Sequence, residues 1–160
     1  MAAEPRPITD DDLAALVELN NSEVPNVGPL DVEKATRLIA LCDQRWAIGE
    51  PLDAFCLTLG PEVDYWSPNY RWVSTEFESF TYLDRVCVAH HLRRQGLGQR
   101  LYRAVEAGST ADWFVLEVNT RPLNRQSLDF HAALGFHEVG RGEPYGDGTE
   151  VAYLAKALVS

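Results

Sequence analysis

Residues 82–102 read YLDRVCVAHHLRRQGLGQRLY and carry more information about the fold than any other part of the chain. An apolar, strand-like run leads into Arg93–Gly98, and a helical pattern follows. A strand that enters a glycine-bearing loop and then a helix is typical of a phosphate-binding site. The first N–H groups of such a helix have no internal partners, and the helix dipole is positive there. Gly96 and Gly98 have no Cβ, so the main chain can approach a ligand closely.

The charge distribution points to the same segment. The 160-residue chain has 24 acidic and 14 basic side chains and a formal net charge of −10. Five of the basic residues fall within 19 positions, namely Arg85, Arg93, Arg94, Arg100 and Arg103. An acidic protein is poorly suited to nucleic acid, whereas a single basic segment suits an anionic ligand. We therefore expect no nucleic-acid partner.

Composition is that of an ordinary globular protein, with 46% apolar and 24% charged residues. We expect residues 1–160 to form one domain. No run approaches the ~18 apolar residues that a membrane span needs, and the N-terminus lacks the apolar core of a secretory signal. Cys42, Cys56 and Cys87 show no metal-ligand spacing. We therefore expect reduced thiols, a cytoplasmic location, no membrane partner and no metal.

The remaining sequence predicts an α/β (α+β) domain with a mixed sheet. Helical spacing follows Thr9 and Asp31, which are good helix N-caps, and a third helix is expected over 124–134. Residues 20–30 and 61–80 are expected to be connections, and the length and aromatic content of the second indicate a lid or a short helix. Strands are expected near Ile8 and over 45–48, 54–59, 82–88, 113–118, 136–139 and 150–158.

Three phosphate-binding chemistries compete for the glycine loop. A P-loop needs Lys and then Ser or Thr after its last glycine, but Gln99 and Arg100 follow Gly98. A dinucleotide fingerprint needs a third glycine or an alanine, where this chain has Leu101. The third chemistry is coenzyme A, whose pyrophosphate can rest on a turn of this kind.

Here the chain resembles the GNAT superfamily of N-acetyltransferases, and more closely a bacterial group of predicted acetyltransferases. The signature of Gln or Arg, two residues, Gly, one residue and Gly or Ala is met by Arg93–Gly98. Residues 116–119, LEVN, are similar to the fifth strand of the superfamily, and 124–136, NRQSLDFHAALGF, to a later motif. The resemblance implies a three-layer fold. In it, helices flank a mixed central sheet of about six or seven strands, and the fourth and fifth strands splay apart.

The resemblance also implies a site for acetyl-CoA as co-substrate. Main-chain groups of the loop would hold the pyrophosphate, and the backbone of the preceding strand would pair with the pantetheine arm. Asn124 matches a coenzyme contact in some members, although a helix N-cap explains the residue type equally well. The coenzyme-binding residues expected are Val86, Cys87, Val88, Arg93, Arg94, Gln95, Gly96, Leu97, Gly98, Gln99 and Asn124.

Two carboxylates are candidates for the base that deprotonates the amine. Asp84 corresponds to a catalytic glutamate in lysine-acetylating members, and Glu117 to the proton acceptor in members that acetylate ribosomal-protein N-termini. Each has a structural alternative: Asp84 can pair with Arg85, and Glu117 can be an outward-facing polar residue. His131 stands where many members place a tyrosine that protonates the leaving thiolate, and it is the candidate for that acid, because an imidazolium can donate a proton. The alternative for His131 is a structural hydrogen bond.

The function expected is an acetyl-CoA-dependent N-acetyltransferase that moves an acetyl group directly to a primary amine of a small molecule or peptide. The alternative from another class is a non-catalytic acyl-CoA-binding or regulatory module, and a weaker one is a structural domain that uses the loop only as a turn. The resemblance also allows a homodimer.

Overall fold

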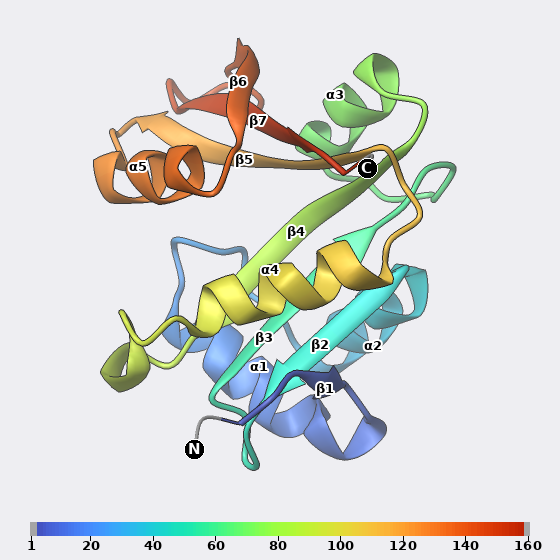
Figure 1. Cartoon of the computed structure of the whole chain (residues 1–160). Coiled ribbons are helices and arrows are strands. Elements are labelled where there is room, and N and C mark those ends of the chain that lie inside the picture. The colour runs from blue at the N-terminus through green and yellow to red at the C-terminus, as the bar shows by residue number, and fades with distance from the viewer. Residues whose placement is uncertain (1–2, 159–160) are drawn as a thin grey trace. The chain divides into compact units, whose positions relative to one another are not determined.

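The strand, loop and helix expected over residues 82–102 form β4 (Phe80–Val88), the 3-10 helix η2 (His90–Leu92) and α4 (Leu97–Gly108), as the computed structural model shows (Figure 1). The structure describes residues 3–158. Gly96, the N-cap of α4, has a left-handed backbone with φ of 80°. Helical periodicity then places four buried side chains on one face of α4: Leu97, Leu101, Tyr102 and Val105.

Seven strands form a mixed sheet in the order β1-β2-β3-β4-β5-β7-β6. The parallel ladder between β4 and β5 joins Phe80–Tyr82 to Trp113–Val115, whereas β1–β2, β2–β3, β5–β7 and β6–β7 are antiparallel. The predicted mixed α/β sheet is therefore confirmed. The other strands are β1 (Arg6–Pro7), β2 (Gln44–Ile48), β3 (Ala54–Leu59), β5 (Trp113–Arg121), β6 (His137–Gly142) and β7 (Glu150–Ala157).

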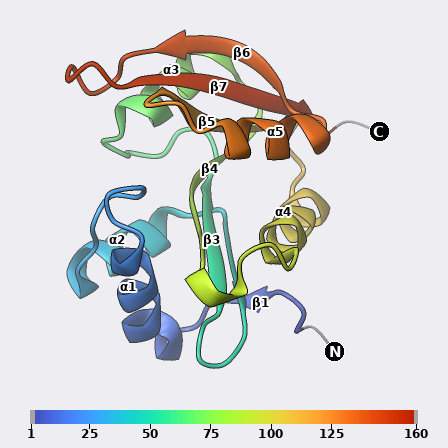
Figure 2. The same ribbon diagram turned by 90° about the vertical axis from the view of Figure 1, so that its left-hand side faces the viewer.

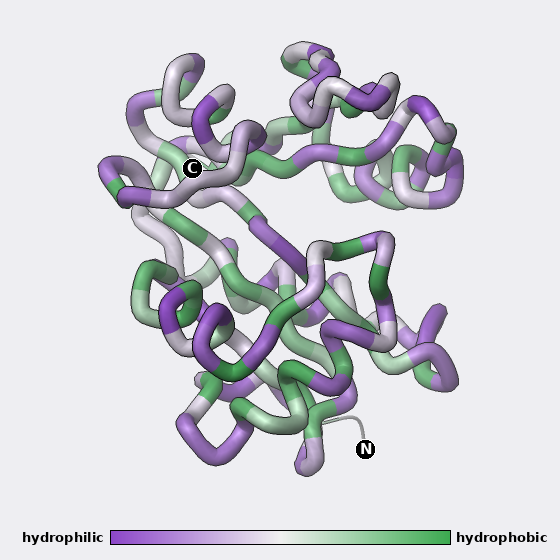
Figure 3. The backbone as a smooth tube through the Cα atoms, turned by 180° about the vertical axis from the view of Figure 1, so that it is seen from behind, coloured by the Kyte–Doolittle hydropathy of each residue, from purple (hydrophilic) through white to green (hydrophobic). Residues whose placement is uncertain are grey.

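The chain divides into two compact units, one ending at Leu59 and resuming over Leu83–Ser109, the other formed by Gly60–Tyr82 and the residues from Thr110 onward. In the first unit α1 (Leu13–Ser22), which follows the 3-10 helix η1 (Asp10–Asp12), and α2 (Val32–Leu41) lie on one side of β3, and α4 lies on the other (Figure 2). All six residues of β3 are buried as a result, which explains its continuous apolar sequence. Hydrophobic and hydrophilic residues both occur along the helical coils (Figure 3), as expected for helices with one packed face.

In the second unit, α3 (Pro68–Glu76) and α5 (Arg125–Ala133) pack on opposite faces of the β5–β7 pair. On the α3 face, Trp72 stacks on Tyr153 with ring centroids 3.9 Å apart. On the α5 face, Phe114 packs edge-on against Phe136, whose ring also meets that of His131. Successive residues of a strand face opposite sides, so Glu117, directly across from Tyr153 in the ladder, shares the α3 face.

One connection differs from the sequence-based expectation, and the other contains the short helix that was one of its two predicted alternatives. The expected loop from residue 20 begins later, because α1 continues to Ser22. Asn20 is buried and its amide group donates to the Gly28 carbonyl 3.0 Å away, which gives a polar helix residue a partner. The long 61–80 connection contains α3, which begins at Pro68 after the N-cap Ser67. Proline in the first helical turn after a serine cap is a common start signal.

The aromatic stack under β6 generates a stability prediction. A Cβ at Gly140 would lie 2.4 Å from the Trp72 ring, whereas a Cβ at Gly142 would lie 3.5 Å from the Tyr153 ring, an ordinary contact. Gly140→Ala should lower the free energy of unfolding by about 1–3 kcal/mol, because the stacked ring must move. Gly142→Ala, the matched control on the same strand, should change it by less than about 0.5 kcal/mol. Urea unfolding measures both; equal midpoints would contradict the packing described.

Candidate active site

The loop before α4 has two left-handed residues within three positions, Arg94 with φ of 67° and Gly96 with φ of 80°. A left-handed non-glycine residue costs on the order of 1–3 kcal/mol and tends to occur where function requires it. Backbone turns of this kind gather N–H groups into a concave anion site. A Cβ built at Gly96 or at Gly98 meets nothing within 4 Å. The loop therefore fits a diphosphate that approaches the main chain from open space.

The arginines of this segment are not equally available to a ligand. The Arg93 guanidinium forms an ion pair with Glu23, the C-cap of α1, and Arg100 donates to the Ala3 carbonyl 3.1 Å away. Arg94 and Gln95 are exposed, and Gln99 at the start of α4 is half-buried. Main-chain amides together with Arg94 are therefore the groups best placed for an anion.

Along β4, Val86 and Val88 are half-buried and Cys87 between them is buried. Burial raises the pKa of the Cys87 thiol to about 12. The thiol therefore stays protonated at neutral pH and is a poor nucleophile. This agrees with the expectation that Cys87 contributes its backbone.

Asp84 pairs with its neighbour Arg85, whose Nε lies 2.7 Å from the Asp84 carboxylate, and the two side chains are only 5% and 10% exposed. Arg85 also donates to the Asn20 side chain and to the Gly28 carbonyl, each at 3.0 Å. The pair thus links β4 to α1 and to the segment that follows α1. A buried charge needs such partners, so the structural role accounts for Asp84 without a catalytic one.

Glu117 is half-buried in β5 and accepts a hydrogen bond from the Tyr82 hydroxyl at 2.6 Å. Burial, with smaller effects from Glu117 and Tyr145, raises the pKa of Tyr153 to about 12. Tyr153 therefore stays neutral and donates to the Asn69 side chain at 2.8 Å. Sequence reasoning missed Tyr82 and Tyr153 as neighbours of Glu117. The registers of the β4–β5 and β5–β7 ladders bring these residues together, and residue spacing in the sequence does not reveal them. The available signal was that Tyr82 lies two residues before Asp84 and therefore on the same face of the strand.

Asn124 caps α5, accepting from the Ser127 N–H at 3.1 Å. His131 is 5% exposed, and its Nδ1 lies 2.7 Å from the Ser127 carbonyl, so this nitrogen carries the proton. Burial lowers the pKa of His131 and this hydrogen bond offsets part of the effect. The imidazole is therefore neutral at pH 7 and its Nε2 has no proton to donate. The predicted acid role of His131 stays untested, and this tautomer does not favour it.

The predicted residues fall into two groups. Asp84, the stretch Val86–Val88 and the loop from Arg93 to Gln99 belong to the first unit, whereas Glu117, Asn124 and His131 belong to the second. Within the second unit Glu117 and His131 lie on opposite faces of the β5–β7 pair. They therefore do not form one acid–base cluster.

Over residues 3–158, no group of three or more His, Cys, Asp and Glu side chains is placed to hold a metal ion. In the same part of the chain, every helix is too short or too polar to cross a membrane.

Known structures share this fold. The ribosomal-protein-S18-alanine N-acetyltransferase of Escherichia coli superposes with a TM-score of 0.74 at 16% identity, covering 98% of this chain and 94% of that one. NAA60 of Arabidopsis thaliana in complex with acetyl-CoA gives 0.73 at 16% identity, covering 96% and 97%. Ard1 of Thermoplasma volcanium gives 0.75 at 14% identity and covers 100% of both chains. At such low identity the likeness shows the fold alone.

No curated protein sequence matches the chain. A family model for the acetyltransferase (GNAT) family matches residues 56–136, which is more than half of the 160 residues. The matched region runs from β3 to the end of the α5 segment and includes the glycine loop, Glu117 and His131. The chain therefore belongs to the acetyltransferase (GNAT) family.

Proposed function

We propose that this protein is an N-acetyltransferase that uses acetyl-CoA and transfers the acetyl group directly to a primary amine. The observation that carries the proposal is the segment from Arg94 to Gln99, in which two left-handed residues, Arg94 and Gly96, precede a twelve-residue helix and a second open glycine, Gly98, lies in its first turn. Such a loop is suited to a diphosphate, and membership in the acetyltransferase family names the diphosphate-bearing donor. Acetyl-CoA supplies the acetyl group as a thioester.

The donor is held mainly by backbone groups. In the proposal, the amides of Arg94, Gln95, Gly96, Leu97, Gly98 and Gln99 bind the pyrophosphate. The backbone of Val86, Cys87 and Val88 pairs with the amide-bearing arm, and a free N–H near Val88 polarises the thioester carbonyl. Arg93 shapes the loop through Glu23. Asn124 contributes as the cap of α5 and as a candidate coenzyme contact.

Glu117 is the proposed base, and Tyr82 is the residue that positions it. A primary amine is mostly protonated at neutral pH and must lose a proton before it attacks the thioester. The Tyr82 hydroxyl donates to one Glu117 oxygen, and an ionised carboxylate is an acceptor at both oxygens, so in the proposal Glu117 takes a proton from the ammonium, directly or through water. Asp84 is the second candidate, but its carboxylate already forms an ion pair with Arg85, which would be lost if the carboxylate took up a proton.

The acid step needs no strong acid from this chain. Coenzyme A thiolate is a fairly stable leaving group, and the neutral His131 has its proton on the nitrogen that bonds Ser127. In the proposal the ammonium loses two protons: the first passes to Glu117 before the attack, and the second leaves the nitrogen as the C–S bond breaks and is taken up by the departing thiolate or by water.

The acceptor is proposed only as a class, a small-molecule amine or a peptide. The similar Escherichia coli enzyme is named for an alanine of ribosomal protein S18, and the similar NatC complex is bound to a Gag peptide. Both similarities support a peptide acceptor. Cys42, Cys56 and Cys87 are free thiols, which suits the proposed cytoplasmic location. A homodimer stays a prediction.

Gly98→Val tests donor binding with little disturbance of the fold. A Cβ at this helical position meets nothing within 4 Å, and valine is a better helix former than glycine, so the free energy of unfolding should stay the same or rise. The family signature accepts glycine or alanine here, so the test needs a side chain larger than a methyl group, and we expect the branched side chain to crowd the amides that would hold the phosphate. The Kd for acetyl-CoA, measured by calorimetry, should therefore rise at least about tenfold. Gly28→Val, also in open space, is the control and should leave the Kd unchanged; tight binding by both variants would refute the loop assignment.

A kinetic series tests the base. An amine library screened by thiol release from acetyl-CoA first supplies a working acceptor. Glu117→Gln should then lower kcat/KM at least about a hundredfold, and Tyr82→Phe about tenfold, because it removes one hydrogen bond to a charged group. Asp129→Asn, an exposed acid of α5, is the control and should react normally. A normal rate for Glu117→Gln contradicts the assignment, and acetyl-CoA binding with no turnover against the whole library supports a non-catalytic module instead.

A further inference from the structure

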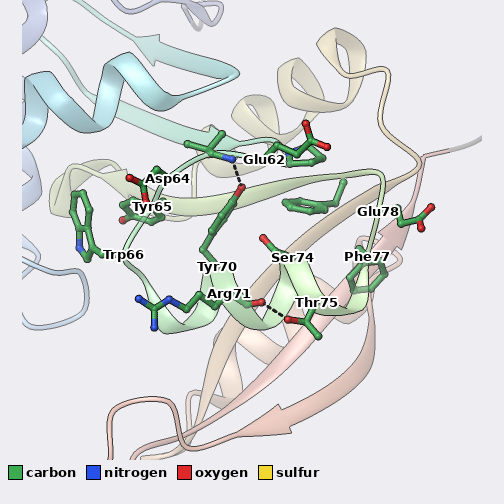
Figure 4. Close-up of a pocket in the computed structure, with 13 residues that line it drawn as sticks. Glu62, Asp64, Tyr65, Trp66, Tyr70, Arg71, Ser74, Thr75, Phe77 and Glu78 are labelled. Carbon is green, nitrogen blue, oxygen red and sulfur yellow. Dashed lines mark hydrogen bonds between the residues drawn. The ribbon is translucent and has the colours of Figure 1, made fainter.

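A groove of about 940 Å³ lies along α3 in the second unit and takes no part in the chemistry proposed above. One wall is the segment over 61–66, and the other is α3 with the residues that lead into β4. Figure 4 shows Trp66 near one end of α3 and Phe77 and Glu78 near the other. The groove therefore extends along the whole helix and is not a single small pit.

The wall over 61–66 is held in place by Tyr70. The Tyr70 hydroxyl donates to the Gly60 carbonyl at 2.6 Å. It also accepts from the Val63 N–H at 3.2 Å, the dashed line at the Tyr70 hydroxyl in Figure 4. Tyr70 itself is only 3% exposed. Glu62, between those two anchors, has a left-handed backbone with φ of 63°. The segment thus has a fixed path, and the groove is formed before any ligand arrives.

The lining combines aromatic rings with uncompensated negative charge. Three carboxylates, Glu62, Asp64 and Glu78, line the groove together with one basic residue, Arg71. Over the described part of the chain none of these three carboxylates forms an ion pair. Trp66 is 56% exposed, and its ring lies 4.6 Å from that of the buried Tyr65. Exposed aromatic faces beside carboxylates favour organic cations. The occupant should therefore be positively charged.

The length and volume of the groove distinguish between two kinds of cation, a linear polyamine and a basic peptide. α3 has nine residues and so spans about 13 Å, the length of about four residues of an extended peptide. A linear polyamine is one methylene chain thick and would leave most of the volume to water. A peptide carries side chains on both sides, and its backbone can bond the exposed Ser74 hydroxyl of α3, which lines the groove.

We propose that the α3 groove binds an extended peptide segment rich in lysine or arginine. This proposal depends on the proposed function in one respect: the bound peptide segment is taken to be part of the acetyl acceptor. The groove is close to the proposed base. The ring of Tyr70, which lines the groove, lies 5.9 Å from that of Tyr82, and Tyr82 holds Glu117. A peptide in the groove is separated from Glu117 by these two aromatic side chains.

Fluorescence anisotropy with labelled hexalysine, in the absence of acetyl-CoA and at low ionic strength, tests the proposal. Wild-type protein should bind hexalysine and ignore hexaglutamate. Trp66→Ala should weaken binding about two- to fivefold through loss of the cation–π contact, and the exposed position of Trp66 means that the variant should fold. The double variant Asp64→Asn/Glu78→Gln should weaken it at least about threefold.

The control is Glu76→Gln/Asp129→Asn, which removes the same two charges from exposed sites outside the groove and should change the Kd less than about twofold. Equal weakening by both double variants would show attraction to net charge alone and overturn the proposal. So would spermine that binds as tightly as hexalysine, or hexalysine binding that none of the variants alters. Calorimetry with acetyl-CoA on the same samples separates the two proposals. Donor binding without peptide binding overturns only the groove, and peptide binding without donor binding overturns only the proposed function.

Discussion

Two opposite charges stand side by side in β4, and much of the first unit is arranged to satisfy them. Asp84 and Arg85 are nearly inaccessible to water, so each must find partners inside the protein. Arg85 reaches its neighbour, the Asn20 amide oxygen and the Gly28 carbonyl at once. This requirement explains why Asn20 is a buried helix residue and why the segment after α1 returns to the strand. It also engages Asp84, which leaves Glu117 as the carboxylate better placed to take up a proton.

Two tyrosines, Tyr82 and Tyr153, are neighbours of Glu117. Tyr82 donates to it, and Tyr153, its partner across the ladder, has a pKa raised to about 12 and directs its own proton to Asn69. The hydrogen bond from Tyr82 helps to fix the orientation of the Glu117 carboxylate. His131 differs because burial lowers its pKa and its single proton is committed to the backbone of Ser127. The family position normally occupied by tyrosine is thus filled here by a group suited to packing.

Local sequence patterns predict most of the helices and strands, but they do not predict which strands pair or in which register. The β3 run over 54–59 and the N-caps Asp31 and Asn124 were readable because apolar periodicity and capping act over a few residues. The glycine loop was readable for the same reason, since its spacing encodes its backbone shape. The bond between Tyr82 and Glu117 was not, because it depends on the register of strands 35 positions apart. The sequence over 61–80 is compatible with either a lid or a short helix, because Ser67 and Pro68, which begin α3, are also typical of a turn.

The ion pair between Arg93 and Glu23 joins the segment before α4 to the end of α1. If the loop moves when an anion binds, the pair must either break or carry the C-terminus of α1 with it. Coupling of this kind is reciprocal. A ligand that orders the segment after α1 changes the binding free energy of the anion at the loop, and the anion changes the binding free energy of that ligand by the same amount. A partly exposed pair is worth no more than about 1 kcal/mol. That is enough to bias the order in which two substrates enter without enforcing it.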